Sequence, residues 1–83
     1  MKYGITCYSP PPWLKLSAGD LVEAEGLTTG GKIRARTITN KTKDSVLCRC
    51  GQPILLAAGP RQLAGRVSNI SVAKEYLEFD LIV

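Results

Sequence analysis

Short runs of alternating apolar and polar residues recur along this chain, with glycine, proline, asparagine and aspartate between them. Alternation has the two-residue period of a β-strand, in which successive side chains point to opposite faces of a sheet. In the clearest run, 76–83, every second residue is apolar: Leu77, Phe79, Leu81 and Val83. The 3.6-residue period of helices is almost absent, so the pattern predicts an all-β protein.

We expect further strands over 3–8, 21–25, 32–39, 45–50, 54–58 and 66–72. The range 54–58 is apolar on both faces, which predicts a central strand, and a single helical turn is expected at 61–63. Many short strands joined by tight turns favour a sheet that closes on itself, because closure removes exposed edges. We therefore predict a small, partly open β-barrel, SH3-like or OB-like, of five to seven short strands.

The chain has 83 residues, of which 45% are hydrophobic and 22% charged, as in ordinary globular proteins. This length predicts one domain over 1–83 with a thin core, too small for a large enclosed active site. Histidine is absent, which excludes Ser-His-Asp and Cys-His catalysis and histidine metal ligands. We expect a protein that is not an enzyme, with no cofactor, no metal and no identified small-molecule substrate.

Two segments resemble short motifs and favour simpler interpretations. Gly26–Ile33 nearly matches the phosphate-binding loop GxxxxGK[ST], but Ile33 replaces the required hydroxyl and an alternating segment replaces the helix. A glycine-containing hairpin turn is expected instead. The triplet Pro10 to Pro12 could be a ligand for an aromatic-lined groove, but strands on both sides favour a stiff crossing anchored by Trp13 and Leu14.

The three cysteines are Cys7, Cys48 and Cys50. An odd number cannot pair completely within one chain, and the N-terminal segment does not match a secretory signal, so we expect a reducing cytoplasm. The cysteines are expected to pack as small hydrophobic side chains; a metal site would need all three thiolates and a carboxylate. The longest apolar stretch, Ile54–Ala58, is too short to span a membrane.

Positive charge is concentrated in the middle of the chain. The formal net charge is +4, but the segment from Thr28 to Lys74 holds nine lysines and arginines and one acid, Asp44. Alternation puts Lys32, Arg34 and Arg36 on one face of a strand, and Ile38 breaks this alternation, which indicates a bulge. The predicted nucleic-acid-binding residues are Lys32, Arg34, Arg36, Lys41, Lys43 and Arg49.

These six cations predict a binding module that contacts the backbone of nucleic acid electrostatically. Thr39, Asn40 and Thr42 would add hydrogen bonds to phosphate. Base stacking is not expected, because the segment from Thr28 to Glu75 contains no aromatic residue. A simpler interpretation is that the cations only keep an exposed strand soluble.

An alternative function is that of a structural or protein-interaction subunit, acting through homo-oligomerisation or by docking on a larger assembly. The acidic pairs Glu23 with Glu25 and Glu78 with Asp80 would then face the basic segment of a neighbouring copy. Salt separates the two functions, since nucleic-acid binding weakens steeply with ionic strength whereas a packed oligomer keeps its mass.

Overall fold

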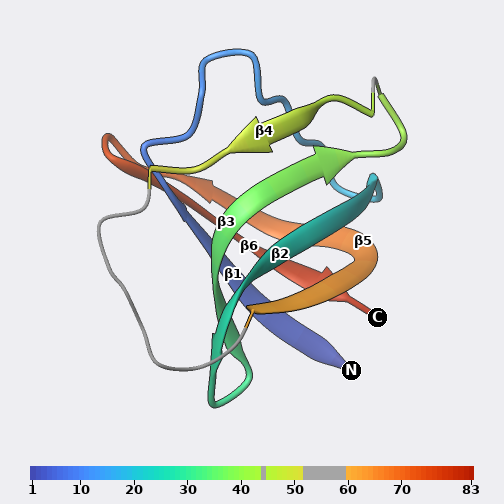
Figure 1. Ribbon diagram of the computed structural model, residues 1–83. Coiled ribbons are helices and arrows are strands. Elements are labelled where there is room, and N and C mark those ends of the chain that lie inside the picture. Colours follow the sequence, from blue (N-terminus) through green and yellow to red (C-terminus); the bar gives the residue numbers. More distant parts are fainter. Residues whose placement is uncertain (44, 52–59) are drawn as a thin grey trace.

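The computed structural model describes residues 1–43, 45–51 and 60–83, and of Thr29, Pro60 and Arg61 only the backbone. This part of the chain contains strands and no helix, which confirms the all-β prediction (Figure 1). The strands are β1 (Lys2–Tyr8), β2 (Leu21–Thr29), β3 (Lys32–Asn40), β4 (Leu47–Arg49), β5 (Pro60–Val72) and β6 (Tyr76–Ile82). No helix among the described residues is long and apolar enough to cross a membrane.

The sheet closes into a small barrel, as predicted. Its strand order is β1-β6-β5-β2-β3-β4, and β1 also pairs with β3, so five strands form a closed ring with β4 attached outside it. The β1–β3 pairing is parallel, with Gly4 opposite Lys32 and Thr6 opposite Arg34, whereas the other pairings are antiparallel. The two ends of the chain meet, because Met1 and Val83 exchange backbone hydrogen bonds of 3.0 and 2.9 Å (Figure 1).

One edge of β3 is shared by two strands. Its first half pairs with β1 and its second half with β4, so β3 changes partner near Arg36. The chain after β4 bridges this point: the Cys50 N–H donates to the Arg36 carbonyl at 2.9 Å, and the Gly51 N–H donates to the Tyr8 carbonyl at 2.7 Å. The ends of β1 and β4 are thereby held together beside the middle of β3.

Alternate residues of the strands fill the barrel, as the alternation predicts. The buried side chains include Tyr3, Ile5, Cys7, Val22, Ala24, Ile33, Ala35, Ile38, Val67, Leu77, Phe79 and Leu81. Ile38 joins the core because β3 carries a bulge: Glu25 pairs with Thr37 and Gly26 with Ala35, so Arg36 is an extra residue. A second irregularity lies in β5, where Asn69 has a positive φ of 52°.

Several predicted boundaries are wrong. Residues 61–63 do not form a helical turn, because they belong to β5 and pair with β2 opposite Gly26, Glu25 and Ala24. β2 does not end at Glu25 but continues to Thr29, and the turn is made by Gly30 and Gly31, whose φ values are 53° and 81°. Local sequence does not reveal which partner extends a strand. The strand predicted at 54–58 lies outside the described residues.

The prediction that Trp13 and Leu14 anchor the crossing after β1 is confirmed for Leu14 and wrong for Trp13. Trp13 is 60% exposed, whereas Leu14 and Leu16 are partly buried and pack against the barrel core. Trp13 is therefore not the anchor. Leu14 and Leu16 hold this crossing to the barrel, because both pack against its core.

All three cysteines are buried as expected, but two of them are joined in a disulfide. Cys7 and Cys50 form a disulfide; their Cα atoms are 5.4 Å apart and the two residues are separated by 43 positions in sequence. Cys48 is buried outside this disulfide. With two thiols oxidised, the three-thiolate metal site cannot form. The disulfide joins β1 to the chain after β4 beside Arg36, where β3 changes partner.

Candidate nucleic-acid interface

The six cations selected from the sequence lie in three places. Lys32 and Arg34 are on the half of β3 that faces β1, and Arg36 and Arg49 lie where β3 meets β4. Lys41 and Lys43 follow the end of β3. On β3, Ile33 and Ala35 are buried, Lys32 and Arg36 are exposed, and Arg34 is half-buried, so all three cations point away from the core.

The two lysines after β3 are paired with acids near the start of β2. The Lys41 Nζ atom lies 3.4 Å from Glu23 Oε1, and the Lys43 Nζ atom lies 3.7 Å from Asp20 Oδ2. Lys43 also donates a hydrogen bond of 2.9 Å to the Ser17 hydroxyl. Their charges are partly neutralised within the molecule, which sets them apart from the cations of β3 and β4.

A hydrogen-bond network, here called the tip network (Ser17, Asp20, Asn40, Thr42 and Lys43), fixes this corner. The Asn40 amide donates to Asp20 Oδ2 and to the Lys15 carbonyl, both at 2.9 Å. Its Oδ1 accepts the N–H groups of Thr42 at 3.0 Å and Lys43 at 3.2 Å. Because Asn40 is only 2% exposed and fully engaged, the expectation that it binds phosphate is wrong.

Of the two neighbouring threonines, Thr39 does not fit that expectation, whereas for Thr42 it stays a prediction. Thr39 is buried, so it is not presented to a ligand. The Thr42 hydroxyl accepts the Leu21 N–H at 2.8 Å, which ties the segment after β3 to the start of β2.

The charge of Asp20 is stabilised inside the tip network. The hydrogen bond from the Asn40 amide lowers the pKa of Asp20 below its ordinary value, although burial acts in the opposite direction. The Ser17 N–H, at 3.0 Å, and the Lys43 ammonium lower that pKa further. Asp20 therefore remains a carboxylate at neutral pH and holds Lys43 in place.

Three cations form what we call the arginine cluster: Arg34, Arg36 and Arg49. Arg36 and Arg49 are exposed and line one surface hollow together with Glu25, Thr37 and Cys50. Within residues 1–43, 45–51 and 60–83, no arginine of the cluster forms a salt bridge. Among the described residues that line this hollow, Glu25 is the one acid, so positive charge is in excess there.

Aromatic rings lie directly beside the arginine cluster. The Arg34 guanidinium carbon is 4.9 Å from the centroid of the Tyr8 ring, and that ring is 6.0 Å from the Tyr76 ring, with the planes tilted by 48°. Tyr8 is half-buried and Tyr76 is 37% exposed. Sequence reasoning found no aromatic residue in the basic segment, and it missed this pair because Tyr8 and Tyr76 come from β1 and β6. The alternation of β6 was the available signal, since it places Tyr76 on the outer face.

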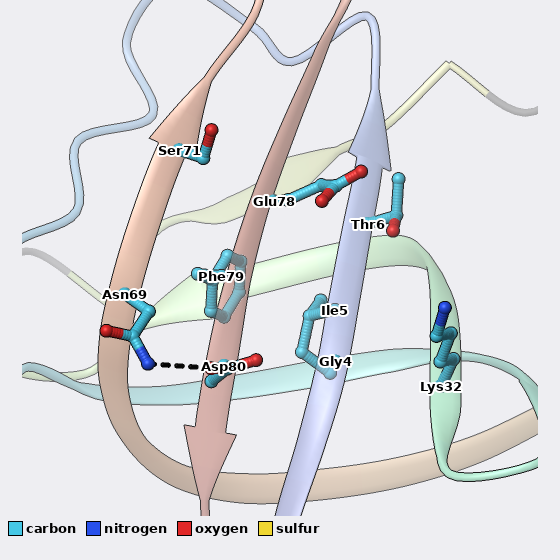
Figure 2. A pocket seen from close by; sticks show the side chains of 9 residues that line it. All are labelled: Gly4, Ile5, Thr6, Lys32, Asn69, Ser71, Glu78, Phe79 and Asp80. Atoms are coloured by element: carbon cyan, nitrogen blue, oxygen red, sulfur yellow. Dashed lines mark hydrogen bonds between the residues drawn. The ribbon is translucent and has the colours of Figure 1, made fainter.

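A second hollow lies over Gly4 on the outside of β1 (Figure 2). Lys32 borders it from β3, and Glu78 and Asp80 border it from β6. Asp80 accepts a hydrogen bond of 2.9 Å from Asn69 and lies 3.6 Å from Lys2 Nζ. The outer face thus changes from basic on β3 to acidic on β6, with the uncharged residues Gly4 and Thr6 between them.

Neither family models, nor curated proteins, nor solved structures gave a match to this chain. Over the described ranges, no group of three or more His, Cys, Asp or Glu side chains could hold a metal ion.

Proposed function

We propose that this protein is a binding module, not an enzyme, and that the arginine cluster contacts the phosphates of nucleic acid. One observation carries the proposal: three arginines from two neighbouring strands point outward, with no salt bridge among the described residues. A guanidinium presents five donors in a planar fork that matches phosphate oxygens, and it remains charged at all physiological pH values. Lys32, on the same face of β3, extends this surface.

The six predicted cations then have unequal roles. Lys41 and Lys43 remain part of the proposed interface, but each already lies beside a carboxylate, so a phosphate must compete with Glu23 or Asp20. Exposed ion pairs are weak, typically under about 1 kcal/mol, and do not exclude a contribution. We expect the arginine cluster to supply most of the affinity.

Salt dependence provides the first test. About three phosphate contacts predict that affinity falls roughly 20-fold for a single strand and roughly 40-fold for a duplex between about 50 and 200 mM salt. Fluorescence anisotropy with a labelled oligothymidylate and a duplex of the same length measures both. No binding of either at low salt would contradict the proposed function.

Charge reversal locates the interface. Arg36→Glu with Arg49→Glu should reduce affinity by at least about tenfold, because two charge-assisted contacts are lost and two repulsions are added. Arg66→Glu is the control: Arg66 is exposed on β5, which β2 separates from β3. A double Arg66→Glu, Lys15→Glu variant matches the change in net charge. Equal losses in both double variants would mean that net charge alone attracts the nucleic acid.

The alternative of oligomerisation through acidic strands has less support. Asp20, Glu23 and Asp80 lie beside lysines of their own chain, and β6 is not an edge strand because it pairs with β1 and β5. Light scattering between low and high salt tests it directly. A constant mass above that of a monomer would favour the alternative.

A cytoplasmic location stays a prediction, and the disulfide makes it testable. Disulfides persist in oxidising compartments and are rare in a reducing cytoplasm, so the Cys7–Cys50 bond weighs toward an oxidising environment. Alkylation of thiols at the moment of cell lysis, followed by mass spectrometry, would show whether Cys7 and Cys50 are oxidised in the cell.

A further inference from the structure

We infer that the nucleic acid is single-stranded and that one of its bases stacks on Tyr76, at the end of a row formed by Arg34, Tyr8 and Tyr76. This inference rests on the proposed function, because the arginine cluster must hold the backbone while the base reaches the ring. It reverses the expectation from sequence that only the backbone is contacted.

The row is built by strand pairing. Tyr8 is directly opposite Tyr76 in the antiparallel β1–β6 ladder, and the parallel β1–β3 pairing brings Arg34 next to Tyr8. Tyr8 therefore lies between a guanidinium at 4.9 Å and a second ring at 6.0 Å. Tyr76 has a neighbour of this row on one side only and is the more exposed ring, so it is the place where a further planar group can be added.

The position of the row favours a single strand over a duplex. In a duplex the base faces are stacked on one another, whereas a single strand can place a base on an aromatic ring while its phosphates meet cations. Arg36 lies on β3 and Tyr76 lies on β6, with β1 between these strands. Two strand spacings, about 10 Å, thus separate β3, which carries Arg36, from β6, which carries the ring.

The charges around the row orient the strand. Glu78 and Asp80 follow Tyr76 on the outer face of β6 and repel phosphates, whereas Lys32 and the arginine cluster lie on the far side of β1. Figure 2 shows Glu78 close to Thr6 and Lys32 beyond β1. The backbone is therefore expected over β3 and β4, and the base over β1 and β6.

The test compares single-stranded oligothymidylate with a duplex of equal length by fluorescence anisotropy. We expect the wild-type protein to bind the single strand more tightly. Tyr76→Ala should weaken single-strand binding by about 5- to 150-fold, the range seen when a stacking ring is removed. Tyr76→Phe keeps the ring and should remain within about twofold. Ile82→Ala truncates another exposed residue of β6, away from the row, and should leave affinity unchanged.

The outcomes separate the two proposals. If Tyr76→Ala binds like wild type while the Arg36→Glu, Arg49→Glu variant does not bind, the proposed function holds and base stacking is wrong. Tighter binding of the duplex would also overturn the inference. If neither nucleic acid binds wild type, the proposed function itself fails.

A crosslinking measurement keeps the inference testable if Tyr76→Ala does not fold. A single strand carrying 5-iodouracil, irradiated on the wild-type protein, should crosslink to the tryptic peptide 75–83, which contains Tyr76. Crosslinks confined to other peptides would overturn the assignment.

Discussion

The arginine cluster and the tip network both contain cations from the basic middle of the chain, yet they use these cations differently. In the tip network, Lys43 lies beside the buried Asp20, and its neighbour Lys41 lies beside Glu23. In the arginine cluster, Arg36 and Arg49 face outward at a bulge and an edge strand, with no salt bridge in the described part of the chain. A run of like charges in a sequence therefore does not give the net charge of the folded surface, because acidic residues on neighbouring segments can neutralise some of the cations.

The two regions are also stabilised by different interactions, and removing the disulfide beside the arginine cluster is expected to change stability the most. Cys7→Ser with Cys50→Ser should lower the free energy of unfolding by about 4 kcal/mol, since a long loop is no longer closed in the unfolded chain. Urea denaturation of wild type with and without a reductant measures it. The double variant is the control, since a reductant should not change its stability. A wild-type protein insensitive to reduction would contradict the prediction.

In the tip network, the residue that matters most is Asn40. Asn40→Ala should lower the free energy of unfolding by about 3 kcal/mol, because the Asp20 carboxylate and the Lys15 carbonyl lose their donor in a buried site. Arg36→Ala is the matched comparison and should change stability by less than about 0.5 kcal/mol, as expected for an exposed side chain. Thermal or urea denaturation distinguishes them. Equal losses of stability in the two variants would contradict the proposed difference between the two regions.

The charge of Asp20 predicts that the contribution of the tip network to stability depends on pH. Because the pKa of Asp20 is lower in the folded state than in the unfolded chain, its charge stabilises the fold at pH values above about 4, the ordinary pKa of an aspartate. This stabilisation is lost as the pH falls below about 4 and through the lowered pKa. Asp20→Asn should therefore be less stable than wild type at neutral pH, with the difference shrinking below about pH 4. A difference that stays constant down to pH 2 would contradict the assignment.

The smallest effect is expected from the lysines in nucleic-acid binding. Lys41→Ala with Lys43→Ala should reduce affinity by less than about threefold, because each ammonium already has a carboxylate neighbour. Arg36→Ala with Arg49→Ala removes the same charge and should reduce affinity more, by about tenfold. Anisotropy at a single salt concentration compares them. The reverse order would place the interface at the lysines that follow β3.

The sequence alone determined which side chains of a strand face the core. Alternation identified Leu77, Phe79 and Leu81 as buried, and the break at Ile38 correctly indicated a bulge in β3. These features are local, because the two-residue period of an extended backbone fixes the direction of each side chain without reference to the rest of the chain. The all-β class and the small barrel follow from the same signal.

Only the tertiary structure decided which strands lie together. The parallel pairing of β1 with β3 puts Tyr8 under Arg34, β6 adds Tyr76, and closure of the barrel brings Cys7 to Cys50. The start of β2 likewise places Asp20 and Glu23 beside the two lysines. Such contacts join residues far apart in sequence, and the free energy of the whole closed barrel selects them, so no local pattern in the chain specifies them.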